Sequence, residues 1–521
     1  MAGAFYQSGK FVPEVLPGVS LGFSNVLYQA FAAGGFAIAD LSAGTLNLNF
    51  YRGIQLVNAL LISLSIVPVY LLVRQFQSHS RALAVSALSA IMPFQALSMF
   101  VMAENLYVPL FWGFTAALFF MLRQPEHRGH AAIAGVLLGG LFLCKPQAIS
   151  VALAAGVVLI VALALAKRFS IASKQLLVAA AIVVITGALT QQAGNLLLQG
   201  ETAAAVGSHY TGAMERPGIG DLLTLAFFKM SAAHLAYVLI VFALPVVHAL
   251  HRLWLAFAER RRDDFLLILV LACLFTSAFA MALIFTQTIA HIERLERIHA
   301  RYYGFVFPAF VILAAALPPA LVRHRAARAS IAIALGLVAL VTLYSFSRFS
   351  TAAFGIDNGD MAWLNLRLLN EQRFYVFVAI LFAALVYAAW QTLRSLNFSR
   401  TGFFVFYTVF ALIASYGQRW NTEKSIALFH ASFPAERQQI VSHIGDFSNQ
   451  VILVEDGFAR RCNYVFWLPY QYVGVLELKP RTPLPEYLNR PNSWLLVVGD
   501  FDAWPGYKER HAYPAFTLYR Y

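Results

Sequence analysis

Long apolar stretches separated by short polar loops run through the chain from about residue 53 to residue 418. About twelve of them approach the ~20 apolar residues that an α-helix needs to cross the hydrocarbon core of a bilayer. This pattern predicts a polytopic α-helical membrane protein with about twelve transmembrane helices in residues 53–418. The runs begin near residues 53, 82, 105, 131, 148, 175, 232, 264, 303, 329, 373 and 402.

The two ends of the chain depart from this pattern. Residues 1–52 are predicted to form an outer loop with interfacial helices, in which Val19–Ala39 is apolar enough to lie in the interface or to span. From Arg419 onward, charged residues and prolines become frequent and the apolar runs shorten to strand length. We therefore predict a small C-terminal α/β domain in residues 419–521. Its predicted elements are a helix at Pro434–Ile444 and strands at Gln450–Glu455 and Ser493–Asp500.

Composition and charge narrow the class of protein. With 60% hydrophobic and 12% charged residues, the chain fits neither a soluble globular protein nor a disordered one. The 38 Lys and Arg against 25 Asp and Glu give a net charge of +13, but the basic residues gather in alternate loops, as in cytoplasmic loops of membrane proteins. The excess indicates membrane topology rather than nucleic-acid binding, and the alternation of the loops makes the C-terminal domain extracytoplasmic. The basic loops contain Arg74, Arg81, Arg123, Arg128, Lys167, Arg168, Lys174, Arg252, Arg260, Arg261, Arg262, Arg323, Arg325, Arg328, Arg394 and Arg400.

Two ionisable residues occupy turns on the opposite, outward side. Glu104 lies between two apolar runs at the outer end of a hairpin, and charges at membrane depth are costly and usually functional. The alternative is a carboxylate that simply reaches interfacial water. Lys145 lies at the next outer turn, where Pro146 ends one helix. Its ammonium can hold a phosphate or extend to lipid headgroups.

Aromatic and basic residues in the outer loops suit a phosphate-bearing lipid. Arg301 offers a planar donor fork for a phosphate, and the adjacent Tyr302 and Tyr303 offer faces for an isoprenoid or a sugar. An amphipathic interfacial helix is the alternative for this segment. The glycine-rich loop at residues 207–218 carries His209 and Tyr210 and is either a lid over a lipid site or a plain connection. Membrane lipids are expected partners of the whole chain.

The sequence offers no clear metal or nucleotide site. Cys144, Cys273 and Cys462 have no paired spacing, and Asp357 and Asp360 do not meet the twelve-residue calcium spacing. There is no glycine-rich phosphate-binding loop, so ATP-driven transport is not supported. No cofactor is indicated with certainty, and a divalent cation stays an open alternative.

Three short motifs carry a resemblance to a known family. The many-helix layout with an outer C-terminal domain resembles the C-type integral-membrane glycosyltransferases, in the branch of protein mannosyltransferases and aminoarabinose transferases. The motifs are Ala-Glu-Asn-Leu-Tyr-Val-Pro-Leu around Glu104, Leu-Cys-Lys-Pro-Gln around Lys145 and the Arg-Tyr-Tyr that begins at Arg301. The resemblance implies transfer of a sugar from a polyprenyl-phosphate donor to a lipid, glycan or protein acceptor on the outer face of the cytoplasmic (inner) membrane. It also implies that Glu104 acts as base or acceptor ligand, that Lys145 and Arg301 bind the donor phosphate, and that Tyr302 and Tyr303 line the carrier groove.

The sequence departs from this family at its start. The family has an acidic residue after its first helix, whereas Met1–Phe11 resembles the segment that follows that acid. Either the sequence is truncated at its N-terminus or another acid, Glu104 or Asp40, serves instead. Two other classes stay open: a transporter or flippase of lipid-linked glycans, and a non-catalytic homologue that binds polyprenyl lipid.

Overall fold

The structure, a computed structural model of the 521-residue chain, describes two compact units. A helical unit extends to residue 316 and an α/β unit begins at residue 436. The runs predicted to begin near residues 329, 373 and 402 lie outside the described residues, as do His209 and Tyr210. The described ranges are 26–41, 50–90, 103–145, 147–199, 225–289, 301–316, 436–445, 449–455, 471–477, 493–499 and 506–521.

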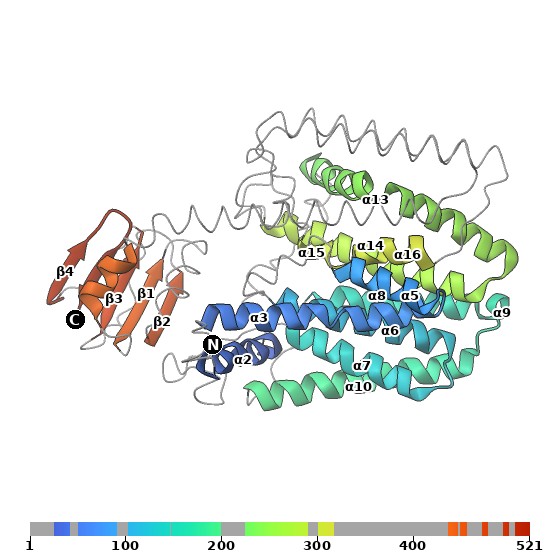
Figure 1. The fold of residues 1–521 in the computed structure, drawn as a ribbon, viewed down its shortest axis with the longest axis horizontal. Helices are drawn as coiled ribbons and strands as arrows, with labels where there is room; N and C mark the ends of the chain where they lie inside the picture. Colours follow the sequence, from blue (N-terminus) through green and yellow to red (C-terminus); the bar gives the residue numbers. More distant parts are fainter. Residues whose placement is uncertain are drawn as a thin grey trace. The chain divides into compact units, whose positions relative to one another are not determined.

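Helices make up nearly all of the described helical unit (Figure 1). Four stretches of the described residues are long and apolar enough to cross a membrane: Arg52–Arg74, Glu104–Arg123, Ser173–Leu197 and Arg262–Ile284. The chain is thus mostly helical, in agreement with the predicted multi-pass membrane protein. The helices are α2 (Val26–Leu41), α3 (Phe50–Ser63), α4 (Ile66–Arg74), α5 (His79–Ala90), α6 (Glu104–Arg123), α7 (Arg128–Cys144), α8 (Ala148–Ala164), α9 (Ala166–Phe169), α10 (Ser173–Gln199), α13 (Leu225–Glu259), α14 (Arg262–Ile289), α15 (Arg301–Gly304) and α16 (Pro308–Ala316).

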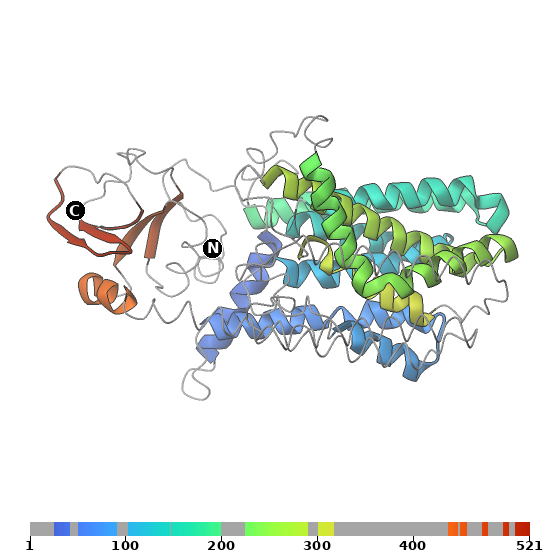
Figure 2. The same cartoon turned by 90° about the horizontal axis from the view of Figure 1, so that it is seen from above.

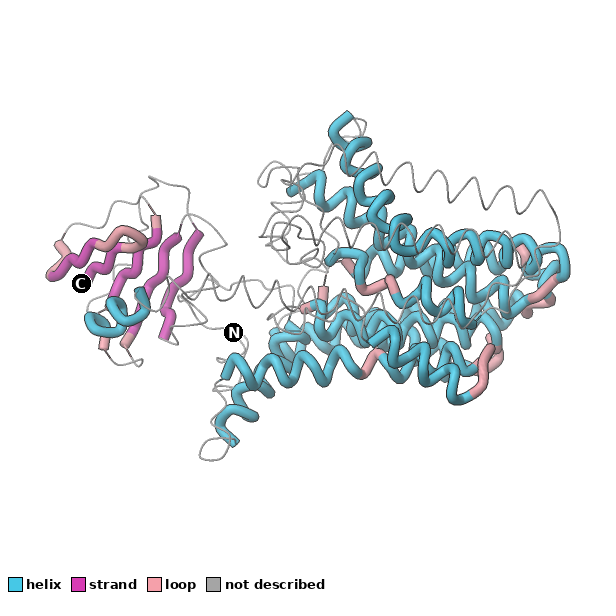
Figure 3. The backbone as a smooth tube through the Cα atoms, turned by 45° about the horizontal axis from the view of Figure 1, so that its top comes forward, coloured by secondary structure: helices cyan, strands magenta, loops and turns pink. Residues whose placement is uncertain are grey.

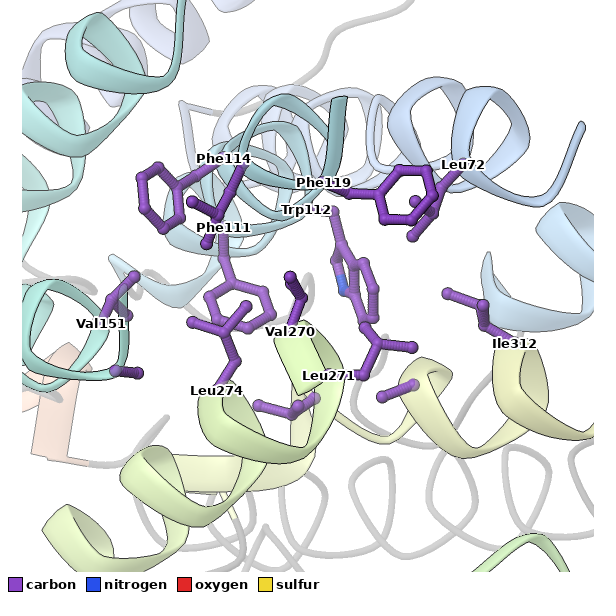
Figure 4. Packing of buried hydrophobic residues seen from close by; sticks show 14 of the residues in the cluster. Leu72, Phe111, Trp112, Phe114, Phe119, Val151, Val270, Leu271, Leu274 and Ile312 are labelled. Atoms are coloured by element: carbon purple, nitrogen blue, oxygen red, sulfur yellow. The ribbon is translucent and has the colours of Figure 1, made fainter. Parts of the chain in front are cut away.

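Helix α6 lies at the centre of the packing. Of its apolar window, 78% is buried, against 22% for α10, which runs along the edge of the helical unit (Figure 1 and Figure 2). Figure 4 shows Phe111 and Trp112 of α6 among Val270, Leu271 and Leu274 of α14. Large aromatic side chains bury the most apolar area per residue, so these contacts fix α6 in the bundle. The packing therefore holds both ends of α6 in place relative to the neighbouring helices.

Basic residues from separate predicted cytoplasmic loops meet at the Arg123 end of α6. The Arg262 guanidinium donates to the carbonyls of Leu122 and Arg123, at 3.0 and 2.8 Å. Arg123 pairs with Asp263 at 3.0 Å, and a buried ion pair joins Arg252 to Asp264. Cationic side chains satisfy the last carbonyls of a helix, which have no intrahelical donor. This end is the one that the loop charges predict to face the cytoplasm.

Helices α7 and α10 approach closely through glycine. A Cβ atom built on Gly139 would lie 2.6 Å from the carbonyl oxygen of Gly187 and 2.7 Å from the Cβ of Thr190. Real Cβ atoms do not come so close to backbone, so this contact requires a residue without a side chain. The glycine lets α10, which is little buried among the described residues, pack on α7 by backbone contact.

We expect Gly139→Ala to lower the stability of the protein in detergent by about 1–3 kcal/mol, because the added methyl group overpacks the α7–α10 contact. Thermal unfolding of the purified protein measures the effect. Gly156→Ala on α8 is the matched control, since a Cβ there meets no described atom within 4 Å. It should leave the stability unchanged or raise it by up to about 1 kcal/mol. Equal melting temperatures for both variants would contradict the close contact.

The α/β unit contains a mixed sheet, drawn in magenta in Figure 3, whose five strands have the order β2-β1-β3-β5-β4. The first three strands in this order are parallel, and β5 is antiparallel to both neighbours. Val451 of β1 is in register with Trp494 of β3, whose five residues are all buried. A helix at residues 436–444 packs Ile440 and Ile444 on this sheet. The strands are β1 (Gln450–Glu455), β2 (Gln471–Glu477), β3 (Trp494–Val498), β4 (Glu509–Ala512) and β5 (Thr517–Arg520).

Two histidines stack between this helix and strand β4. The rings of His443 and His511 are 3.7 Å apart, and His443 Nε2 is 2.6 Å from the Tyr513 hydroxyl. Burial, and secondarily the charge of His511, lower the pKa of His443 below its ordinary value of 6.5, although Glu509 opposes them. A lowered pKa in the folded state means that the unfolded chain binds a proton more readily. His443 therefore makes its full contribution to the stability of the α/β unit above pH 6.5. That contribution is lost as the pH falls below this value.

Acidification should accordingly open the contact between the helix at residues 436–444 and strand β4. We expect amide hydrogen exchange in these segments of the full-length protein to speed up at pH 5 relative to the intrinsic rate, with little change between pH 7 and 8. His443→Phe keeps a stacked ring but cannot titrate, so it should remove the acid sensitivity. The same pH response in this variant would exclude His443 as its origin.

Candidate active site

Glu104 and Lys145, predicted separately from two outer turns, form an ion pair in the structure. Lys145 Nζ lies 2.5 Å from Glu104 Oε1, and each side chain is 8% exposed. The pairing follows from the α6–α7 hairpin, because residues 124–127 connect the helices and bring the first residue of α6 beside the last turn of α7. Helix α7 ends at Cys144 and α8 begins at Ala148, as the proline at position 146 predicts.

The backbone around the pair is held by further hydrogen bonds. Lys145 has an extended conformation, φ −156° and ψ 141°, as expected for a residue before proline. Its N–H donates to the Leu141 carbonyl at 2.8 Å, and the Cys144 thiol donates to the Ala103 carbonyl at 3.3 Å. Breaking a buried ion pair by removing one partner costs about 3–5 kcal/mol, because the other charge is left uncompensated. The two charges therefore stabilise each other at this depth.

A small cavity lies one helical turn from the ion pair. Its polar wall is formed by Tyr107, Gln147 and Ser150, and its apolar wall by Phe305 and by alanine and methionine side chains of α14. The space open to the centre of a water molecule is about 10 Å³, which is room for one water and not for a sugar ring. The Tyr107 hydroxyl is buried and has no hydrogen-bond partner among the described residues. The Tyr107 hydroxyl is thus a polar group near Glu104 that could hydrogen-bond to a molecule in this cavity.

Tyr303 of the predicted donor-binding motif is buried in the bundle. Its exposure is 0%, its hydroxyl is 3.0 Å from His234 Nδ1, and the edge of its ring meets Phe279 at a centroid distance of 5.2 Å. Aromatic side chains thus surround the Tyr303 ring. That Tyr303 lines the carrier groove stays a prediction.

The α15 turn, which begins at Arg301, lies at the Glu104 end of α6. The Phe305 ring meets Tyr107 at 5.2 Å, and the Phe305 carbonyl accepts a 3.0 Å hydrogen bond from Trp112 Nε1. The structure thus brings the Arg301 backbone to the end of α6 that carries the ion pair. The side chains of Arg301, Tyr302 and Asp40 lie outside the described set; the Asp40 backbone belongs to the last turn of α2.

Sequence reasoning did not single out three polar residues of this region. Tyr107 and Gln147 belong to the two quoted motifs around Glu104 and Lys145, so their positions were available as signals. His234 is a lone histidine in an apolar run and carries no such signal. Within the described ranges, no group of three or more His, Cys, Asp or Glu residues is placed to hold a metal ion.

Comparisons with known proteins place this geometry in a family context. Residues 43–190, which include Glu104 and Lys145, match the family model described as dolichyl-phosphate-mannose-protein mannosyltransferase. The fold matches that of ArnT from Cupriavidus metallidurans in the apo state, with a TM-score of 0.51 and 14% identity over 95% of this chain and 86% of that one. The chain has the fold of a C-type membrane glycosyltransferase. The resemblance stated from the sequence is thereby confirmed.

A second structure of the same relative supports this C-type glycosyltransferase fold. ArnT from Cupriavidus metallidurans bound to undecaprenyl phosphate matches with a TM-score of 0.52 and 13% identity, over 99% of this chain and 91% of that chain. No protein of curated function matches the sequence. At this identity the likeness concerns the fold alone, so the chemistry of the site around Glu104 and Lys145 rests on its own residues.

Proposed function

We propose that the protein transfers a sugar from a polyprenyl-phosphate carrier to a lipid, glycan or protein acceptor. The buried Glu104–Lys145 pair carries the proposal, because it places a carboxylate and an ammonium side by side at one end of the central helix. The matching family is named for dolichyl-phosphate mannose, and the ArnT relative is described as bound to undecaprenyl phosphate. Both descriptions support a phosphorylated polyprenyl lipid as the donor.

The residues suit a direct displacement at the sugar. A bond forms between the acceptor oxygen and the anomeric carbon while the bond from that carbon to the phosphate oxygen breaks. Glu104 accepts the proton of the acceptor hydroxyl, and the polyprenyl phosphate leaves with its charge stabilised by Lys145 and Arg301. The attack occurs opposite the leaving group, so the anomeric centre is inverted.

The ion pair gives this mechanism an order of events. Before substrate arrives, Lys145 neutralises Glu104 at 2.5 Å. A donor phosphate competes with the carboxylate for the ammonium, and its binding would release Glu104 toward the acceptor. Donor binding thus frees Glu104 to act as the base. Before the donor binds, the ion pair keeps the carboxylate from interacting with lipid headgroups or water.

The remaining assignments are part of the same proposal. Asp40 is the second candidate acid, Tyr302 contacts the carrier, and His209 and Tyr210 cover the site. The membrane domain covers residues 53–418 with about twelve spans, preceded by an outer segment at residues 1–52. The α/β domain at residues 419–521 is extracytoplasmic, and the protein resides in the inner membrane with its basic Arg123 end toward the cytoplasm.

The direct test is sugar transfer by the purified protein in lipid vesicles. Polyprenyl-phosphate-linked hexoses and pentoses are offered with lipid, glycan and peptide acceptors, and the products are identified by mass spectrometry. Release of free polyprenyl phosphate together with a glycosylated acceptor supports the proposal, and the effect of a chelator decides whether a divalent cation takes part. Movement of a labelled solute or lipid-linked glycan across the vesicle without sugar transfer would instead show a transporter or flippase.

A further inference from the structure

A polar pair deep in the aromatic core joins helix α13 to the α15 turn. His234 Nδ1 is 3.0 Å from the Tyr303 hydroxyl, and both side chains have 0% exposure. Leaving one of two buried polar groups without its hydrogen bond costs about 1–3 kcal/mol. The interior therefore favours arrangements in which this bond is made, so it sets the position of α15 relative to α13.

Aromatic side chains also contact the Tyr303 ring. Phe279 of α14 meets it at 5.2 Å and Phe307 at 5.8 Å, both edge to face. Such pairs tolerate a range of ring offsets with small changes in energy. A hydrogen bond is directional, so the bond to His234 fixes the rotation of the α15 turn more closely than the aromatic packing does.

The position of the α15 turn affects the candidate site because the turn begins at Arg301 and is followed by Phe305. Arg301 precedes Tyr303 by two residues, and Phe305, two residues beyond, contacts Tyr107 near the ion pair. A rotation of α15 about its axis displaces the Arg301 backbone relative to Lys145. The spacing of the two cationic residues proposed to hold one phosphate thus depends on how α15 is held.

We infer that His234 is a positioning residue, which holds the α15 turn through the Tyr303 hydroxyl and so sets where Arg301 meets the phosphate of a bound polyprenyl lipid. The inference rests on the proposed function for the existence of that lipid site. His234 itself does not touch the phosphate. Its effect passes through Tyr303, so removing either partner should have the same result.

The test measures the Kd of undecaprenyl phosphate for the full-length protein in detergent. His234→Leu and Tyr303→Phe should each raise the Kd about tenfold, and the double variant should be no worse than either one. His234→Asn keeps a polar atom at the Nδ1 position in a side chain of leucine size, so its Kd should stay within about threefold of the wild type. This rescue separates the hydrogen bond from the volume of the side chain.

A matched control removes a comparable bond elsewhere. Tyr28 of α2, 1% exposed, donates to Asn58 Oδ1 at 3.1 Å. Tyr28→Phe should lower the melting temperature as much as Tyr303→Phe while leaving the Kd unchanged. Equal changes of the Kd in the two tyrosine variants would overturn the inference, because the loss would then follow stability alone.

The remaining outcomes are equally decisive. If the wild type binds the lipid and both His234→Leu and Tyr303→Phe bind it equally well, the positioning role is wrong and the proposed function is untouched. If the wild type does not bind undecaprenyl phosphate, the proposed function and the inference both fail. If the expected pattern of Kd values appears in a protein that transfers no sugar, the positioning role stands and the proposed transfer reaction fails.

Discussion

Glu104→Gln should reduce sugar transfer by about 10²- to 10⁴-fold, the range over which a positioned general base contributes to catalysis. The amide has nearly the shape of the carboxylate but cannot accept the proton of the acceptor hydroxyl. It also leaves Lys145 unneutralised, because the 2.5 Å contact in the native structure joins two opposite charges. The transfer rate at saturating donor and the melting temperature must therefore be measured together.

Asp263→Asn is the matched control for this variant. It breaks the 3.0 Å ion pair with Arg123 at the other end of α6, where the partners are 29% and 40% exposed. Exposed pairs contribute only about 0–1 kcal/mol, so both the rate and the stability should change little. Sugar transfer by Glu104→Gln at the wild-type rate would show that Glu104 is not the base. Asp40→Asn would then test the second candidate acid.

Lys145→Met should abolish stabilisation of the leaving phosphate and lower transfer by about 10²- to 10³-fold, as for other preorganised charge-stabilising groups. Methionine keeps an unbranched side chain of similar length but leaves the Glu104 carboxylate buried without its ammonium partner. The expected loss of stability is about 3–5 kcal/mol. Steady-state kinetics over a range of donor concentrations, with thermal unfolding in parallel, measure both effects.

The double variant Glu104→Leu, Lys145→Met separates chemistry from folding. Replacing both members of a buried ion pair by hydrophobic side chains of similar volume is often neutral for stability. We expect the double variant to regain the wild-type melting temperature and to remain inactive. Activity that returns together with stability would show that the pair only maintains the fold. Arg301→Ala, measured beside it, should lose transfer without the stability change of a broken Glu104–Lys145 pair.

The individual charges of the candidate site were readable from the sequence, whereas their pairing was not. Glu104 and Lys145 stand out because ionisable residues at membrane depth on the outward side are rare. They are 41 residues apart in the chain, and only the antiparallel packing of α6 and α7 brings them to 2.5 Å. Tyr303 shows the opposite case: its position beside Arg301 favours an interfacial role, but contacts with His234 and Phe279 bury it.

The same contrast holds in the α/β unit. Strands β1 and β3 lie where continuous apolar runs predict them, since strands buried in a parallel arrangement show no polar alternation. Strand β4 has the sequence Glu-Arg-His-Ala and alternates between half-buried and exposed positions. Four residues with this composition give no hydrophobic signal, so their strand conformation depends on pairing with β5.

The contacts at the two ends of α6 also bear on the choice of membrane. Glu104 at the first residue pairs with Lys145 after α7, and the carbonyls of Leu122 and Arg123 at the last turn accept hydrogen bonds from Arg262 of α14, so both ends of α6 are held by neighbouring helices. Twenty helical residues span about 30 Å, the thickness of an average hydrocarbon core. We expect a helix held at both ends to adjust its own tilt less to a thinner or thicker bilayer than a free helix does, so that more of the adjustment falls to the lipids. We therefore expect the protein to favour bilayers whose acyl chains give a hydrocarbon core as thick as α6 is long.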